Sequence, residues 1–156
     1  MIFDYIAARM KMKILFALAL LACAPAYAQK NEVYATAEGA IHGYDPVAYF
    51  TENKAVKGQP QFKAVWKGQM WYFSSQKNKT VFEASPESYA PQYGGFCAFG
   101  MSRGYKATTD PFAYTIVNGK LYLNYSRSIQ EDWNKQRQHF IQRADQNWPT
   151  VKAKEM

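Results

Sequence analysis

Residues 113–125 read AYTIVNGKLYLNY, in which two runs of aromatic, β-branched and aliphatic side chains flank Asn118-Gly119. Asn-Gly is the dipeptide that best satisfies the positive backbone dihedrals at both central positions of a two-residue hairpin turn. We therefore expect strands over 113–117 and 120–125, paired antiparallel through that turn.

A helical pattern comes after this hairpin. Ser128 and Glu131 have the spacing of a capping box, in which the serine and the acid each bond a free backbone N–H at the helix start. Apolar residues then recur at spacings of three, four and seven: Ile129, Trp133, Phe140, Ile141, Ala144 and Trp148. The pattern predicts one amphipathic helix of about five turns that runs to Asn147 and is stopped by Pro149.

A second hairpin is predicted upstream. Residues 61–66 alternate polar with apolar side chains, Lys67-Gly68-Gln69 forms a turn, and residues 70–73 return as an aromatic strand. No segment is repeated and no low-complexity linker interrupts the chain, which indicates a single folding unit.

Two short helices are expected after that hairpin. Ser74 or Ser75 caps the first, which runs to about Ala84 with Val81 and Phe82 facing inward. The second begins at Ser85-Pro86-Glu87, with proline at the first helical position and an acid in the first turn. Hairpins and helices without strand-helix-strand alternation predict an α+β fold, a small antiparallel sheet with short helices and a long C-terminal amphipathic helix.

The N-terminus has the pattern of a secretion signal. Three basic residues within positions 9–13 precede the apolar run 14–22, and Ala26-Tyr27-Ala28 is a small-residue cleavage site. The apolar run is shorter than the roughly 20 residues of a membrane-spanning helix, so no transmembrane anchor is expected. The pattern predicts removal of residues 1–28, whether translation starts at Met1, Met10 or Met12.

A different processing event stays open at Cys23. Leu20-Leu21-Ala22-Cys23 loosely resembles a lipoprotein box, in which the cysteine would become the lipid-bearing first residue. We therefore expect a periplasmic or secreted protein, with lipid anchoring through Cys23 as the alternative.

The length and composition favour one small domain. The 156 residues carry a net charge of +7, and removal of residues 1–28 takes away three of 19 basic and one of 12 acidic side chains, which leaves +5. The basic residues are spread along the chain, as on a solvated surface, and do not form the clustered stripe of a nucleic-acid-binding module. We expect one domain over residues 29–149 with a tail over 150–156.

Three segments in this order resemble a YHS domain: YDPVAYF at 44–50, WKGQMWYFSS at 66–75 and FEASPESY at 82–89. The likeness covers about residues 43–92. Continued through the glycine-rich run 93–100 and GKLYLNY at 119–125, the chain is similar to exported YHS-containing proteins, some of whose relatives carry selenocysteine.

The resemblance implies soft-metal chemistry, with a departure in this chain. YHS domains that accompany heavy-metal transport proteins carry cysteines after Asp-Pro-Val and at the helix entry, where thiolates can hold Cu(I) or Zn. Here Ala48 follows Val47, and Ser74-Ser75 stand at the helix entry. That thiolate site is therefore not carried over, although the fold can be.

Cys97 is the candidate that remains. It lies in the run YGGFCAFG at 93–100 and is the only cysteine left if Cys23 departs with the signal. One thiol makes no internal disulfide, so in an oxidising compartment it is buried and inert, paired with another molecule, or used in metal or redox chemistry. Gly94-Gly95 permits unusual backbone dihedrals, and neighbouring phenylalanines can shield the sulfur.

His42, Met70 and Met101 lie in or near the same motifs. Cysteine, histidine and methionine together suit Cu(I), and the candidate metal ligands are Cys97, His42 and Met101. The alternatives are a hydrogen-bonded structural histidine and core-filling methionines, and His139 has the simple interpretation of a solvated helix face.

These residues support three hypotheses about function. The first is an exported, nonenzymatic binding protein that holds Cu(I) or another soft metal through Cys97, assisted by His42 or Met101. The second is a thiol-redox protein in which Cys97 is oxidised or forms a mixed disulfide with a partner. The third is a scaffold that binds a small molecule, peptide or envelope protein through its tyrosines, with Cys97 in the core.

Overall fold

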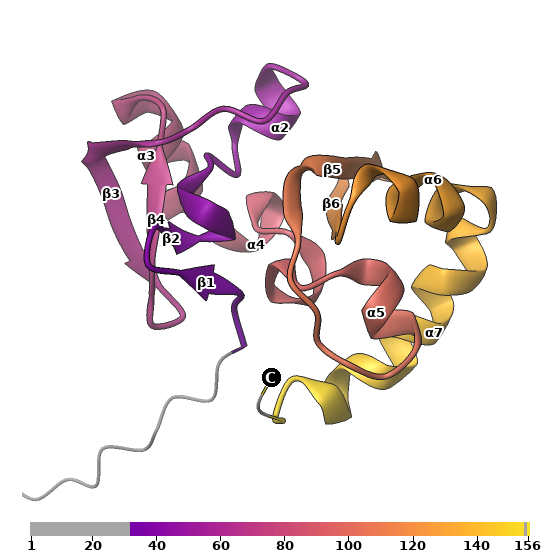
Figure 1. The fold of residues 1–156 in the computed structure, drawn as a ribbon. Coiled ribbons are helices and arrows are strands. Elements are labelled where there is room, and N and C mark those ends of the chain that lie inside the picture. Colours follow the sequence, from indigo (N-terminus) through magenta and orange to yellow (C-terminus); the bar gives the residue numbers. More distant parts are fainter. Residues whose placement is uncertain (1–31, 155) are drawn as a thin grey trace, which may run out of the picture.

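The computed structural model describes residues 32–154 and 156, so the predicted signal at 1–28 lies outside the described residues. The described chain forms two halves that pack against each other (Figure 1). The first half contains β1 (Ala35–Thr36), β2 (Gly39–Ala40), the 3-10 segment η2 (Ile41–Gly43), α2 (Ala48–Thr51), β3 (Gln59–Trp66), β4 (Gln69–Phe73), α3 (Gln76–Ala84) and α4 (Pro86–Tyr89). The second contains η3 (Gln92–Gly95), α5 (Ala98–Ser102), β5 (Asp110–Val117), β6 (Lys120–Asn124), α6 (Arg127–Lys135) and α7 (Arg137–Val151).

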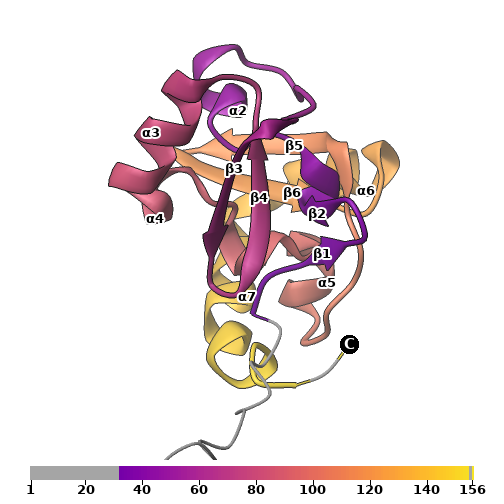
Figure 2. The ribbon, with the colours of Figure 1, turned by 90° about the vertical axis from the view of Figure 1, so that its left-hand side faces the viewer.

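Within the part of the chain that the structure describes, the strands pair in three antiparallel two-stranded sheets, β1 with β2, β3 with β4 and β5 with β6. The β5–β6 turn is Asn118-Gly119, with φ of 50° and 72°, and the β3–β4 turn is Lys67-Gly68, with φ of 48° and 72°. A two-residue turn with positive φ at both central residues has a twist that matches the twist of the flanking strands. Both predicted hairpins and the α+β class are confirmed, and the hairpins cross each other in Figure 2.

Strand β6 lies between two hydrophobic cores. Leu121 and Leu123 belong to the first core with Trp71 and Phe82, whereas Tyr122 belongs to the second with Trp133. Successive side chains of a strand point to opposite faces, so one strand supplies both cores. This is why every residue from Leu121 to Asn124 is buried.

One of the predicted helix caps is confirmed and another is wrong. Ser75 caps α3 as expected, accepting the N–H of Asn78. The capping box at Ser128 is wrong, because the extended residue at the start of α6 is Ser126, whose side chain accepts the N–H of Ile129. The chain leaves β6 at Asn124, so the helix begins soon after the strand.

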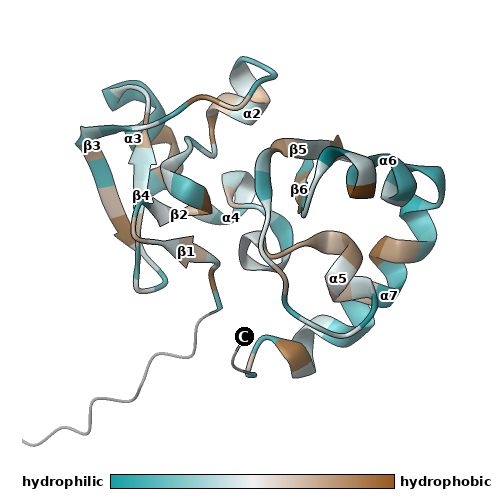
Figure 3. Ribbon diagram, viewed as in Figure 1, coloured by the Kyte–Doolittle hydropathy of each residue, from teal (hydrophilic) through white to brown (hydrophobic). Residues whose placement is uncertain are grey.

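The predicted single C-terminal helix is two helices. Gln136, with φ −137° and ψ 36°, separates α6 from α7, and the break lets Trp133 and Ala144 both enter the second core. Pro149 does not stop the helix, because Lys152 N–H bonds the Trp148 carbonyl and closes the last turn. Both helices are mostly hydrophilic (Figure 3), and no helix of the described residues is long and apolar enough to cross a membrane.

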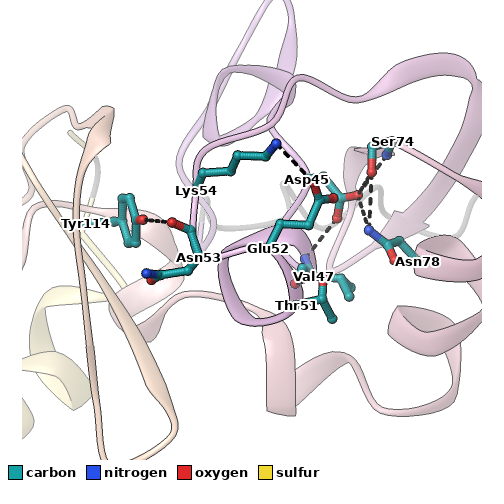
Figure 4. A network of polar contacts seen from close by, with 9 residues as sticks. All are labelled: Asp45, Val47, Thr51, Glu52, Asn53, Lys54, Ser74, Asn78 and Tyr114. Atoms are coloured by element: carbon teal, nitrogen blue, oxygen red, sulfur yellow. Dashed lines mark hydrogen bonds and ion pairs between the residues drawn. The ribbon is translucent and has the colours of Figure 1, made fainter.

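The buried carboxylate of Asp45 ties the first half together (Figure 4). Its Oδ1 accepts the N–H groups of Val47 and Ala48 at 2.9 and 3.3 Å. Its Oδ2 accepts the N–H and hydroxyl of Ser74 and the amide of Asn78, each at 2.7 Å. A fully buried carboxylate is tolerated when donors surround it, and here they come from α2, from the end of β4 and from α3.

We predict that Asp45→Asn lowers the free energy of unfolding by about 3 kcal/mol, because its amide NH₂ would face the donors of Ser74 and Asn78 across a buried gap. Asp110→Asn is the matched control, since Asp110 also precedes a proline but accepts one exposed N–H, from Phe112. Its cost should stay within about 0.5 kcal/mol. Urea unfolding of both variants makes the comparison, and equal losses would contradict the role given to Asp45.

Candidate functional site

The chain reaches Cys97 through a left-handed turn. Tyr93, Gly94 and Gly95 have φ of 55°, 63° and 86°. A Cβ atom on Gly94 would lie 1.7 Å from the carbonyl oxygen of Glu32, and the Gly94 carbonyl accepts the Tyr34 N–H at 2.8 Å. Glycine is required at this position both by the backbone dihedral and by the close approach of the neighbouring segment.

A second left-handed turn carries His42. Ile41, His42 and Gly43 have φ of 44°, 58° and 72°. This turn packs on the first, because a Cβ atom on Gly95 would lie 2.7 Å from Ile41 Cγ2. The N–H of Ile41 also bonds the Tyr34 carbonyl at 3.1 Å, so Tyr34 bridges both turns. Such conformations are costly for residues other than glycine and are held only by well-packed surroundings.

Cys97 is the N-cap of α5 and is 2% exposed. Its Sγ accepts the Gly100 N–H at 3.5 Å, and its thiol donates to Asn124 Oδ1 at 3.7 Å. Its own N–H bonds the Ala107 carbonyl at 3.1 Å. The sulfur is therefore a hydrogen-bonded group at the start of a short helix, shielded from solvent.

Asn124 is a site residue that sequence reasoning missed. It is fully buried at the end of β6, and its Oδ1 accepts the Phe99 N–H at 3.2 Å as well as the thiol. Its Nδ2 has no hydrogen-bond partner among the described residues. The sequence offers no signal for this role, because the contact joins positions 27 residues apart.

The imidazole of His42 is half-buried and makes two polar contacts. Its Nε2 lies 2.8 Å from the Thr109 carbonyl oxygen and 3.2 Å from the Tyr34 hydroxyl. A carbonyl only accepts, so the network assigns the hydrogen to Nε2 and leaves Nδ1 with the lone pair of the neutral ring. Burial raises the pKa of Tyr34, which keeps this hydroxyl protonated.

The three predicted metal residues are placed differently. Cys97 caps α5 and Met101 lies within it, where the Met101 N–H bonds the Cys97 carbonyl at 2.8 Å, and Met101 is fully buried in the second core. No hydrogen bond or ring contact within residues 32–154 joins His42 to either of them. Met70 is half-buried in β4, and His139 is exposed on α7. Over the same residues, no three His, Cys, Asp or Glu side chains are grouped as a metal site.

Comparison with known families identifies one segment of the chain. Residues 47–93 match the YHS domain. Comparison with curated proteins and with solved structures gave no match. The YHS segment begins two residues after Asp45 and ends at Tyr93, so it covers α2 to the start of the left-handed turn. Cys97, Met101 and His42 all lie outside it.

The left-handed turn before Cys97 generates a prediction. Gly94→Ala should lower the free energy of unfolding by more than about 3 kcal/mol, because the added methyl meets the Glu32 backbone in a packed interior. Gly119→Ala is the control, since Gly119 has a similar φ of 72° but open space around its Cβ position. It should cost only about 1 kcal/mol of backbone strain. Thermal and urea unfolding measure both, and equal costs would show that close packing at Gly94 is unimportant.

Proposed function

We propose that the protein is a nonenzymatic binding protein that holds a soft metal ion, Cu(I) foremost, between Cys97 and Met101. The observation that carries the proposal is the placement of two sulfur-bearing residues at the N-cap and within one short helix, with a backbone N–H directed at the thiol. The YHS segment supports a metal-related role, through the resemblance to YHS domains of heavy-metal transport proteins.

The donor set fits a soft ion of low coordination number. Cys97 is the N-cap of α5, with φ −55° and ψ 119°, and Met101 follows four residues later inside the helix, so the two residues lie about one helical turn apart along the chain. Soft thiolate and thioether ligands favour Cu(I), Zn and Fe–S clusters, and a donor set of low coordination number suits Cu(I) among these. Zinc sites in proteins usually have three or four ligands from cysteine, histidine and carboxylates, and the described residues group no such set.

One backbone donor is already directed at the Cys97 sulfur. Binding requires loss of the thiol proton, which now faces Asn124 Oδ1. The Gly100 N–H already points at the sulfur, and a hydrogen bond to an ionised acceptor is roughly twice as strong as one to a neutral acceptor. When bound, the metal would be able to bind a further soft ligand or be transferred to a partner protein. The helix would hold the two sulfur atoms in place.

His42 is the weaker candidate for a third ligand. Its Nε2 is engaged by the Thr109 carbonyl, so only Nδ1 could bind a metal without breaking that contact. We therefore assign His42 to the support of the Thr109 segment, and a Cu(I) titration of the His42→Gln variant decides its part in the metal site.

We place this activity after export, in the periplasm or outside the cell. The basic residues, apolar run and Ala-Tyr-Ala site of the N-terminus support this placement. A chain with one remaining cysteine avoids wrong disulfides in an oxidising compartment and keeps the thiol available for a soft metal.

Titration of the reduced protein with Cu(I), against a chelator of known affinity, tests the proposal. We expect one ion per chain for the parent, no competitive binding for Cys97→Ser, and at least tenfold weaker binding for Met101→Leu, a volume-conserving change. His42→Gln should bind like the parent. Circular dichroism verifies the fold of each variant, and equal binding by the parent and Cys97→Ser would overturn the proposal.

Alkylation of the folded, metal-free protein separates this proposal from thiol-redox chemistry. Because Cys97 is 2% exposed, iodoacetamide should react far more slowly with the native protein than with the protein in denaturant. The same measurement on Gly94→Ala, whose turn is disturbed, should show faster reaction. Rapid alkylation of the native parent would favour the redox hypothesis instead.

A further inference from the structure

A cleft of about 340 Å³ lies between the two halves of the molecule. Its walls come from the turns of both hairpins, the connection from α4 to η3, the start of the described chain and α7. Volumes of 300 Å³ and above are typical of small-molecule sites, which occur preferentially between structural units. Cys97 does not line this cleft, so a ligand bound here would be independent of the proposed metal site.

Aromatic rings form the cleft walls. Trp66 is half-buried and packs edge-on against Trp71, with ring centroids 5.7 Å apart, while Trp148 on α7 packs against Tyr93 at 6.1 Å. Trp71 is fully buried and donates its indole N–H to the Trp66 carbonyl at 3.1 Å. The two half-buried indoles therefore stand on rigid supports, one on each half, and present apolar ring surface to the cleft.

The charges at the rim favour an anion. Three lysines and two glutamates line the cleft, and one pair of these, Lys152 with Glu32, lies at 4.0 Å. Lys67 and Lys120 are exposed and have no carboxylate within ion-pair distance among the described residues. Glu87 is the one glutamate of the cleft that likewise forms no ion pair among these residues, so the unpaired charges of the cleft are two positive and one negative. Lys67 Nζ lies 4.5 Å from the centroid of the Trp66 ring, so a cation and a planar surface are adjacent.

The backbone at Lys67 is strained. This residue occupies the first central position of the β3–β4 turn with φ 48°, where the β5–β6 turn has Asn118 with φ 50°. Asparagine and glycine suit this position, whereas a long side chain is disfavoured in the left-handed conformation. Strain that persists at a cleft is an indication of function, and here it places an ammonium group at the edge of an aromatic wall.

We propose that the cleft binds a small organic anion with a planar ring, with the ring against the indoles of Trp66 and Trp148 and the acidic group between Lys67 and Lys120. The planar part takes the apolar ring surface, and the anionic part takes the two lysines that lack a carboxylate partner. Neither the family match nor the metal proposal assigns a ligand to this cleft.

The probe is 2-naphthoate, and 2-naphthalenemethanol, which has the same ring system but no charge, is the control compound. Titration of the isotope-labelled protein should move the indole N–H resonances of Trp66 and Trp148 saturably, while that of Trp133, buried in the second core, stays in place. The alcohol should bind at least fivefold more weakly. Equal binding of acid and alcohol, or no saturable shift at either indole, would overturn the proposal.

Lys67→Asn separates binding from stability. It gives the β3–β4 turn an asparagine, as the β5–β6 turn has at position 118. We therefore expect a higher midpoint of urea unfolding together with at least fivefold weaker naphthoate binding. Lys120→Gln should weaken binding similarly, and Lys63→Gln, an exposed charge outside the cleft, should leave it unchanged. Parental affinity in both Lys67→Asn and Lys120→Gln would overturn the assignment of these lysines.

Discussion

Two left-handed turns that meet across Tyr34 are the constraint on which the rest of the structure depends. One carries His42 and the other leads to Cys97, and both run through three consecutive residues with positive φ. Tyr34 bonds the first through its carbonyl and the second through its N–H. Because Gly95 packs on the Ile41 side chain and Tyr34 bonds both turns, neither turn can open without disturbing the other. The junction joins the YHS segment to the second half and fixes the start of α5.

Local chemistry explains what the sequence predicted, and long-range packing explains what it did not. The Asn118-Gly119 turn and the Ser75 cap depend on neighbouring residues, so both were predictable. The break at Gln136 carries no glycine or proline signal, because the second core sets it. The two glycines before Cys97 indicated an unusual backbone conformation. The contact of the Cys97 sulfur with Asn124 joins the start of α5 to the end of β6, and such a contact leaves no periodic pattern in the sequence. Site residues joined by such contacts need a structure to be found.

The YHS segment contributes a scaffold and one wall of the cleft. Where the resemblance implies a cysteine at the helix entry, this chain has Ser74, whose N–H and hydroxyl both bond the buried Asp45 carboxylate. That position therefore has a structural role here. The two proposed soft donors lie beyond the end of the segment, at the N-cap of α5 and within it, while Trp66 and Lys67 of the segment line the cleft. The two proposed sites use different residues, and each can be lost without the other.

Copper K-edge X-ray absorption, on protein loaded with one equivalent of Cu(I), tests the central claim most directly. The placement of Cys97 and Met101 on α5 predicts a first shell of two sulfur atoms and no nitrogen. A first shell of nitrogen or oxygen without sulfur would contradict the metal site altogether. One sulfur with one nitrogen would contradict the pairing with Met101 and direct attention to His42 Nδ1.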